Sequence, residues 1–154
     1  MTRLLLTFAA LGAGATLAMV PAVAAAQTRI DLRVEAVGTR RASGAEAAIG
    51  LRTLVSPYLR AEASVGGAFW HSAEPKLPSP RTEAAFRFLL DPINEQKWGL
   101  SFAGGLGYVD SPYLLVAADL EGQPMAGWRP AFRVALGGGT RIGLVLRRAI
   151  PNRR

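Results

Sequence analysis

The chain has a single histidine, His71, which stands beside Ser72 and close to Glu74 in the segment FWHSAEP. These are the residue types of a nucleophile–base–acid triad, in which the histidine must lie within hydrogen-bond reach of the serine. Here the three residues are crowded into one proline-containing segment, and their spacing does not place them in that geometry. We therefore interpret the segment as a polar loop tip and expect the protein not to be an enzyme.

Other polar segments are less similar to a catalytic or ligand-binding site. Asp91, Glu95 and Lys97 in DPINEQK are typical of a charged turn. The glycines of GGLGYVDS (104–111) could cradle a phosphate only if a helix followed them, and a strand pattern follows instead. No carboxylates have metal-ligand spacing with the histidine, and there is no cysteine. The sequence predicts no metal, no cofactor and no thiolate chemistry.

The elements that carry the charged residues alternate between polar and apolar side chains. In RIDLRVEA (29–36), every second residue is charged and the residues between them are apolar. A strand places successive side chains on opposite faces. The same period of two recurs over 44–54, 58–69, 81–90, 98–109, 128–137 and 141–147, and it is less clean over 113–121. The class is therefore all-β, and eight strands joined mostly by short turns predict an antiparallel up-and-down barrel, whose closure removes the sheet edges.

The turns set the expected register of the hairpins. We place turns at 55–57, at 110–112 and at 138–140. The first of these brings Arg52 and Glu62 near one another along a diagonal of the sheet.

The N-terminus predicts export. A charged start with Arg3, an apolar run over 4–20 and the small residues Ala24 and Ala26 are typical of a secretory signal peptide cleaved before Gln27. We expect residues 1–26 to be this signal peptide and residues 27–154 to form one barrel domain. The whole chain has a formal charge of +7, and removal of Arg3 leaves 17 basic and 11 acidic residues, or +6.

The charged face of the barrel could point outward into water or inward into a lumen. Its glycines and serine, Gly99, Ser101, Gly105 and Gly107, favour the inward direction, because a narrow interior needs small residues beside long arginines. We expect a paired charge network inside the barrel. Its members are Arg29, Asp31, Arg33, Glu35, Glu46, Arg52, Arg60, Glu62, Arg81, Glu83, Arg87, Arg129, Arg133 and Arg141, and Asp119 and Glu121 share the same face.

The apolar face carries the aromatic residues, and several of them stand near strand ends. Trp98 and Trp128 begin strands at one end, whereas Phe69 and Tyr108 end strands at the other. Such a placement is typical of the aromatic girdles of a membrane barrel.

This pattern, over residues 28–148, resembles the small eight-stranded outer-membrane barrel proteins of Gram-negative-type bacteria. The resemblance implies a transmembrane barrel in the bacterial outer membrane, with outer-membrane lipid and the barrel assembly machinery as partners. An interior this narrow and this full should conduct little, so we expect a structural role or interaction through loops. Arg40 and Arg41 would then contact anionic lipid headgroups, and Arg147, Arg148, Arg153 and Arg154 would form a solvated basic tail.

Two alternatives stay open at this point. A soluble periplasmic barrel similar to lipocalins would reverse the two faces and hold an apolar ligand. An outer-membrane lipid-modifying enzyme would use His71, because the histidine, serine and glutamate near the rim are similar to the lipid A deacylases of this barrel class. The arginines alternate with apolar residues in an exported chain, so we expect no nucleic-acid partner.

Overall fold

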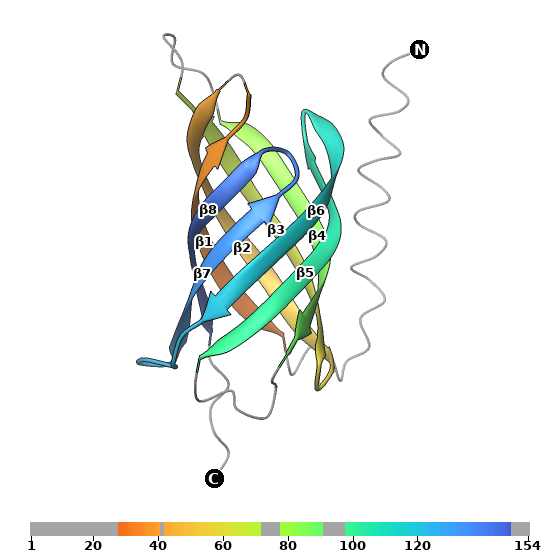
Figure 1. Cartoon of the computed structure of the whole chain (residues 1–154), viewed down its shortest axis with the longest axis vertical. Helices are drawn as coiled ribbons and strands as arrows, with labels where there is room; N and C mark the ends of the chain where they lie inside the picture. The colour runs from red at the N-terminus through yellow and green to blue at the C-terminus, as the bar shows by residue number, and fades with distance from the viewer. Residues whose placement is uncertain (1–27, 41, 72–77, 91–97, 149–154) are drawn as a thin grey trace.

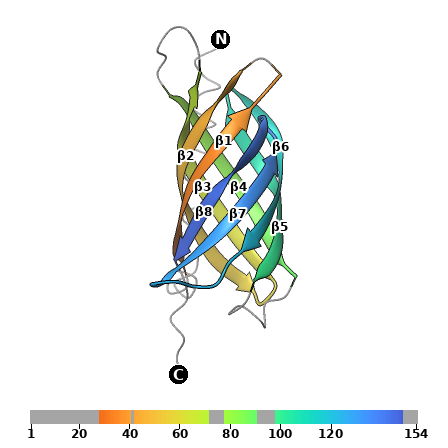
Figure 2. The ribbon, with the colours of Figure 1, turned by 60° about the vertical axis from the view of Figure 1, so that its left-hand side comes forward.

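The protein is a closed barrel of eight antiparallel strands, seen here in a computed structural model that describes residues 28–40, 42–71, 78–90 and 98–148. The strands are β1 (Arg29–Gly38), β2 (Ser43–Ser56), β3 (Leu59–Trp70), β4 (Ser79–Leu89), β5 (Gly99–Val109), β6 (Ser111–Glu121), β7 (Trp128–Leu136) and β8 (Thr140–Arg148). Each strand pairs with its neighbours in the chain, and β1 pairs with β8 to close the sheet (Figures 1 and 2). The eight-stranded antiparallel barrel predicted from the alternation is therefore confirmed.

The two ends of the barrel differ in what they carry. We call the end where β1 begins and β8 ends the terminal end, which is the lower end in Figure 1. The opposite, distal end carries the β1–β2, β3–β4, β5–β6 and β7–β8 connections. No helix in the described ranges is long and apolar enough to cross a membrane.

All three expected turns are displaced. Val109 pairs with Ser111 around Asp110, which adopts a φ of 56°, where we expected a turn over 110–112. The β7–β8 turn is 137–139, three glycines with positive φ, where we expected 138–140. Both shifts move the register by two residues, so the face of every side chain is preserved.

The β2–β3 turn was also wrong in register. β2 continues to Ser56, with an irregularity between Leu54 and Ser56, and the turn follows it. As a result Arg52 lies directly opposite Glu62, and not on a diagonal.

The distal rim is uneven. β6 pairs with β7 only over 116–121 and 131–136, so 111–115 of β6 rise past the end of β7 within the described part of the chain. The β5–β6 hairpin consequently stands above the β7–β8 turn in Figure 1. Leu114, in this rising segment, is 76% exposed.

Burial alternates along the strands and is inverted relative to a water-soluble protein. The interior contains charged side chains, small residues and a few apolar ones such as Leu115 and Val145, whereas large apolar side chains cover the outside. The direction of the charged face, which the alternation alone left open, is thus inward.

Several expectations fall outside the described residues. These are the signal peptide (1–26), Arg41, Ser72, Glu74, Asp91, Glu95, Lys97, Arg153 and Arg154.

Candidate functional site

The expected network residues all occupy inward-facing positions of the strands. Twelve of the fourteen are buried, and Arg29 and Glu62 are half-buried. Alternation explains this, because each strand turns every second residue toward the same interior. The structure therefore brings the named charges into one lumen, where their pairing can be followed residue by residue.

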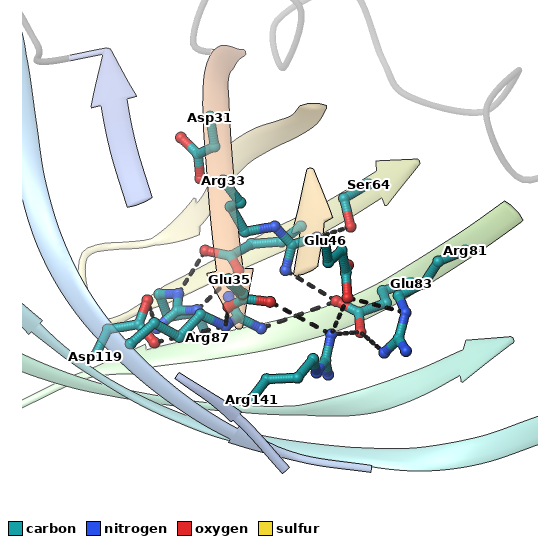
Figure 3. Close-up of polar contacts among 12 residues, drawn as sticks. Asp31, Arg33, Glu35, Glu46, Ser64, Arg81, Glu83, Arg87, Asp119 and Arg141 are labelled. Atoms are coloured by element: carbon teal, nitrogen blue, oxygen red, sulfur yellow. Dashed lines mark hydrogen bonds and ion pairs between the residues drawn. The ribbon is translucent and has the colours of Figure 1, made fainter. Parts of the chain in front are cut away.

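In the distal half of the lumen, Glu83 of β4 lies at the centre of a cluster (Figure 3). Arg33 donates to its carboxylate at 2.9 Å and Arg141 at 2.5 Å. The Tyr113 hydroxyl donates to it at 2.7 Å. Arg81 then reaches Glu46 at 3.0 Å. Four strands thus meet at one carboxylate, and charge-assisted bonds of this kind are the strongest that side chains form.

In the terminal half, two carboxylates of β6 hold the arginines. Asp119 contacts Arg87 at 3.0 Å and makes a hydrogen bond with Arg147. Glu121 contacts Arg147 at 3.0 Å and Arg129 at 3.3 Å. Arg87 also donates from two nitrogens to both carboxylate oxygens of Glu62, the fork-to-fork geometry that suits arginine.

Arg133 of β7 joins the two halves. Its guanidinium lies 3.2 Å from Glu35 and 3.9 Å from Glu83 on the distal side, and 4.0 Å from Asp119 on the terminal side. The network is therefore continuous along the lumen. Among the ion pairs given for the described residues, those of Arg133 link the two halves.

Two residues of the network escaped the sequence reasoning. Arg147 was expected in a solvated tail, and this was wrong: it is fully buried and contacts Asp31, Asp119 and Glu121. Tyr113 was not singled out, although its parity with Asp119 on one strand could have placed it inward. Its ring faces Gly107 across the β5–β6 ladder, where a Cβ would lie 2.3 Å from the ring.

A small cavity lies within the described part of the lumen. The cavity inside it is about 20 Å³ and is lined by residues that include Asp31, Arg33, Glu62, Glu83 and Arg133. A volume of this size holds about one water molecule. The side chains that line this cavity are mostly charged or polar.

His71 is exposed just beyond the end of β3, where its backbone N–H donates to the Ser43 carbonyl at 2.8 Å. Its suggested partners Ser72 and Glu74 lie outside the described residues. Elsewhere in the described ranges, no three histidine, aspartate or glutamate side chains are grouped to hold a metal ion.

The expected girdle residues face outward at the two ends. Phe69 and Tyr108 are exposed near the distal end, and Trp98 is exposed near the terminal end. Trp128 is half-buried, with the Arg148 guanidinium 5.5 Å from its ring centre. Tyr58, which the sequence reasoning omitted, stacks on Phe88 at the terminal end.

No protein-family model matches this chain, and no curated protein matches it either.

Proposed function

We propose that this protein is an outer-membrane β-barrel of Gram-negative-type bacteria with a structural role or a role in interaction through its loops. The observation that carries the proposal is the inverted burial. Arginines and carboxylates fill the interior, and 28 large apolar side chains are exposed among the described residues. Membrane barrels place polar side chains inside and apolar ones against lipid.

The extent of the apolar surface supports lipid as the surrounding solvent. Exposed residues such as Val34, Ile49, Phe86, Leu106 and Leu144 lie on strands all around the barrel. Water-soluble monomers rarely expose a continuous apolar patch above a few hundred Å². A band that encircles the molecule exceeds this by far, and burial in lipid would stabilise it.

The strand lengths also fit a bilayer. The shortest strands, β7 and β8, have nine residues each. At about 3.3 Å per residue and a tilt of about 40°, nine residues rise about 23 Å, close to the apolar band of about 25 Å in outer-membrane barrels. The predicted signal peptide supports delivery to the cell envelope.

The filled lumen favours a structural or loop-mediated role over transport. A space for about one water molecule does not give a conducting path. The same filling disfavours the lipocalin-like alternative, because that barrel needs an apolar cavity and an outer face of charges.

The test is to express the full chain in a bacterium with an outer membrane and to separate the membrane and periplasmic fractions. Boiled and unboiled samples are then compared on a denaturing gel. We expect the protein in the outer-membrane fraction, with a mobility that changes on boiling because the closed barrel resists detergent. Recovery in the aqueous periplasm without detergent would refute the proposal.

The lipid-modifying alternative is tested in the same preparation. His71→Ala should leave the lipid acyl chains of the host unchanged relative to the wild-type protein. A loss of lipid hydrolysis in this variant would replace the structural role with a catalytic one.

A further inference from the structure

One charged side chain breaks the apolar outer face of the strands. Arg148, the last residue of β8, faces outward and is exposed, whereas every other charged residue on the eight strands faces the lumen. Its outward neighbour on β8 is the exposed Leu146. A charge on the lipid face of a barrel is costly near the middle of a bilayer, and this cost falls to almost nothing at the bilayer edge. A single cation on this face therefore needs an explanation in terms of its height along the barrel.

The height of Arg148 fits an edge of the lipid. Arg148 and Trp128 form the first pair of the β7–β8 ladder, and Leu136 and Thr140 form the last. These strands rise about 23 Å, close to the apolar band of about 25 Å in outer-membrane barrels. The two pairs would therefore lie at the two edges of that band. Arg148 would be level with lipid headgroups, with its aliphatic stem on the apolar surface.

The guanidinium of Arg148 lies over an aromatic ring. Its central carbon is 5.5 Å from the ring centre of Trp128, a cation–π distance. This contact holds the guanidinium in place and leaves its charge in being, whereas lumen arginines such as Arg33 pair with carboxylates such as Glu83. The planar fork of an arginine matches two oxygens of a phosphate group. Arg148 thus presents an uncompensated, positioned cation on the outer face of the described barrel.

A tight hairpin positions Trp128. The backbones of Met125 and Trp128 exchange two hydrogen bonds, at 2.7 Å and 2.9 Å. Between them, Ala126 and Gly127 have φ values of 49° and 79°, which suits a two-residue hairpin turn. The turn lies at the terminal end of the barrel (Figures 1 and 2). The ring that supports the Arg148 guanidinium is therefore fixed by backbone structure.

Two segments that continue from strand ends at the terminal end, 91–97 and 149–154, lie outside the described residues. The first contains Asp91, Glu95 and Lys97, and the second contains Arg153 and Arg154. Two acidic and three basic side chains sum to a formal charge of +1, so these segments together do not cancel the charge of Arg148.

We propose that Arg148 and Trp128 bind the headgroup of an anionic phospholipid at the terminal-end edge of the bilayer. The guanidinium pairs with oxygens of the lipid phosphate, and the indole lies at the level of the headgroup, where tryptophan is favoured. Leu146, one pair deeper on β8, contacts the acyl chains. The preference for anionic lipid follows from the positive charge of Arg148. This inference rests on the proposed membrane location of the barrel.

The test is a titration of phosphatidylglycerol into the protein expressed from the full chain and purified in a detergent without phospholipid. Native mass spectrometry counts the bound lipids. We expect one phosphatidylglycerol to bind with a lower Kd than phosphatidylcholine, which has the same phosphate but no net charge. Arg148→Gln should raise the Kd for phosphatidylglycerol about fivefold, the effect of one arginine near an anionic surface. Trp128→Leu, which removes the ring, should raise it about two- to fivefold.

The matched control is Arg154→Gln, which removes the same charge from a residue outside the described ranges. It should leave the Kd for phosphatidylglycerol unchanged. Equal weakening in Arg154→Gln and Arg148→Gln would overturn the proposal, since it would indicate nonspecific attraction. Equal Kd values of the wild-type protein for the two lipids would overturn it as well. The mobility of unboiled samples on a denaturing gel shows that each variant is folded.

A further variant asks whether the chain itself supplies the partner of Arg148. Asp91→Asn combined with Glu95→Gln should leave the Kd for phosphatidylglycerol unchanged. A lower Kd in this variant, restored by adding Arg148→Gln, would overturn the proposal, because the acidic segment would then be the partner of the guanidinium.

The result is separable from that of the localisation test. Recovery in the outer-membrane fraction without a preference for phosphatidylglycerol would overturn this inference and leave the proposed function standing. Recovery in the aqueous periplasm would overturn both.

Discussion

Neutralising Glu83 should strongly destabilise the barrel. Glu83→Gln keeps the size of the side chain but removes the charge that Arg33, Arg141 and Tyr113 contact. The distal cluster would change from four arginines and three glutamates to four arginines and two glutamates. The arginines are Arg33, Arg81, Arg133 and Arg141, and the glutamates are Glu35, Glu46 and Glu83.

The magnitude follows from the contacts. Two hydrogen bonds from arginine to Glu83 contribute about 1.5–3 kcal/mol each, and the glutamine oxygen retains part of this. Loss of one partner from a buried charge cluster costs about 3–5 kcal/mol, because the remaining charges stay buried. We therefore expect the free energy of unfolding to fall by about 3–5 kcal/mol.

The assay is urea unfolding in detergent or lipid vesicles, followed by tryptophan fluorescence. Asp110→Asn is the control, because it neutralises an exposed carboxylate at the β5–β6 turn, where the left-handed backbone tolerates asparagine. The reasoning is refuted if Glu83→Gln and Asp110→Asn both stay within about 0.5 kcal/mol of the wild-type protein. Adding Arg141→Gln to Glu83→Gln should cost less than the sum of the two single changes, since neither partner is then left alone.

Three further outcomes are expected. Leu144→Arg, at an outward position in the middle of β8, should destabilise the protein in a bilayer by about 2–4 kcal/mol, whereas an unchanged stability in urea titration would contradict a lipid-facing surface. Gly107→Ala should cost about 1–3 kcal/mol in the same titration, because the new Cβ would collide with the Tyr113 ring. Gly104→Ala on the outer face of the same strand, with no atom within 4 Å of its Cβ, should be neutral, and equal effects would exclude the collision as the cause. The mass of the purified protein should correspond to a chain that begins at Gln27, and a retained N-terminal segment would refute the cleavage site.

The sequence predicts the faces of the strands far better than their connections. A period of two assigns Arg33, Glu83 and Arg141 to one side whatever the register, because a shift of two residues preserves the face. The turns at Asp110 and at Gly137–Gly139 were misplaced because alternation does not distinguish two registers that differ by two residues. Positive φ at three successive glycines lets the β7–β8 chain turn over 137–139 and not over 138–140, and alternation carries no signal for it.

The sequence predicts that arginines and carboxylates pair within the lumen, but it does not predict which residues pair. That arginines and carboxylates would meet follows from their confinement in a narrow interior. Which of them meet depends on the stagger of strands far apart in the chain, as in the contact of Arg33 with Glu83. Arg147 was missed because it stands beside other arginines near the chain end, where a charge run is typical of a solvated tail. Tyr113 was missed because the inward face of β6 also carries the apolar residues Leu115 and Ala117, so the alternation between polar and apolar residues is unclear on this strand.

The uneven rim determines where a bilayer could end against this barrel. Backbone groups without partners are not tolerated in hydrocarbon, and residues 111–115 of β6 have no pairing with β7 in the described structure. On that side the hydrocarbon would therefore reach no higher than the Leu136–Thr140 pair. The β5–β6 hairpin, which rises above the β7–β8 turn, would then stand in water (Figure 1). The distal end of the barrel is thus asymmetric around the barrel axis, with a lower rim on the β7–β8 side than on the β5–β6 side.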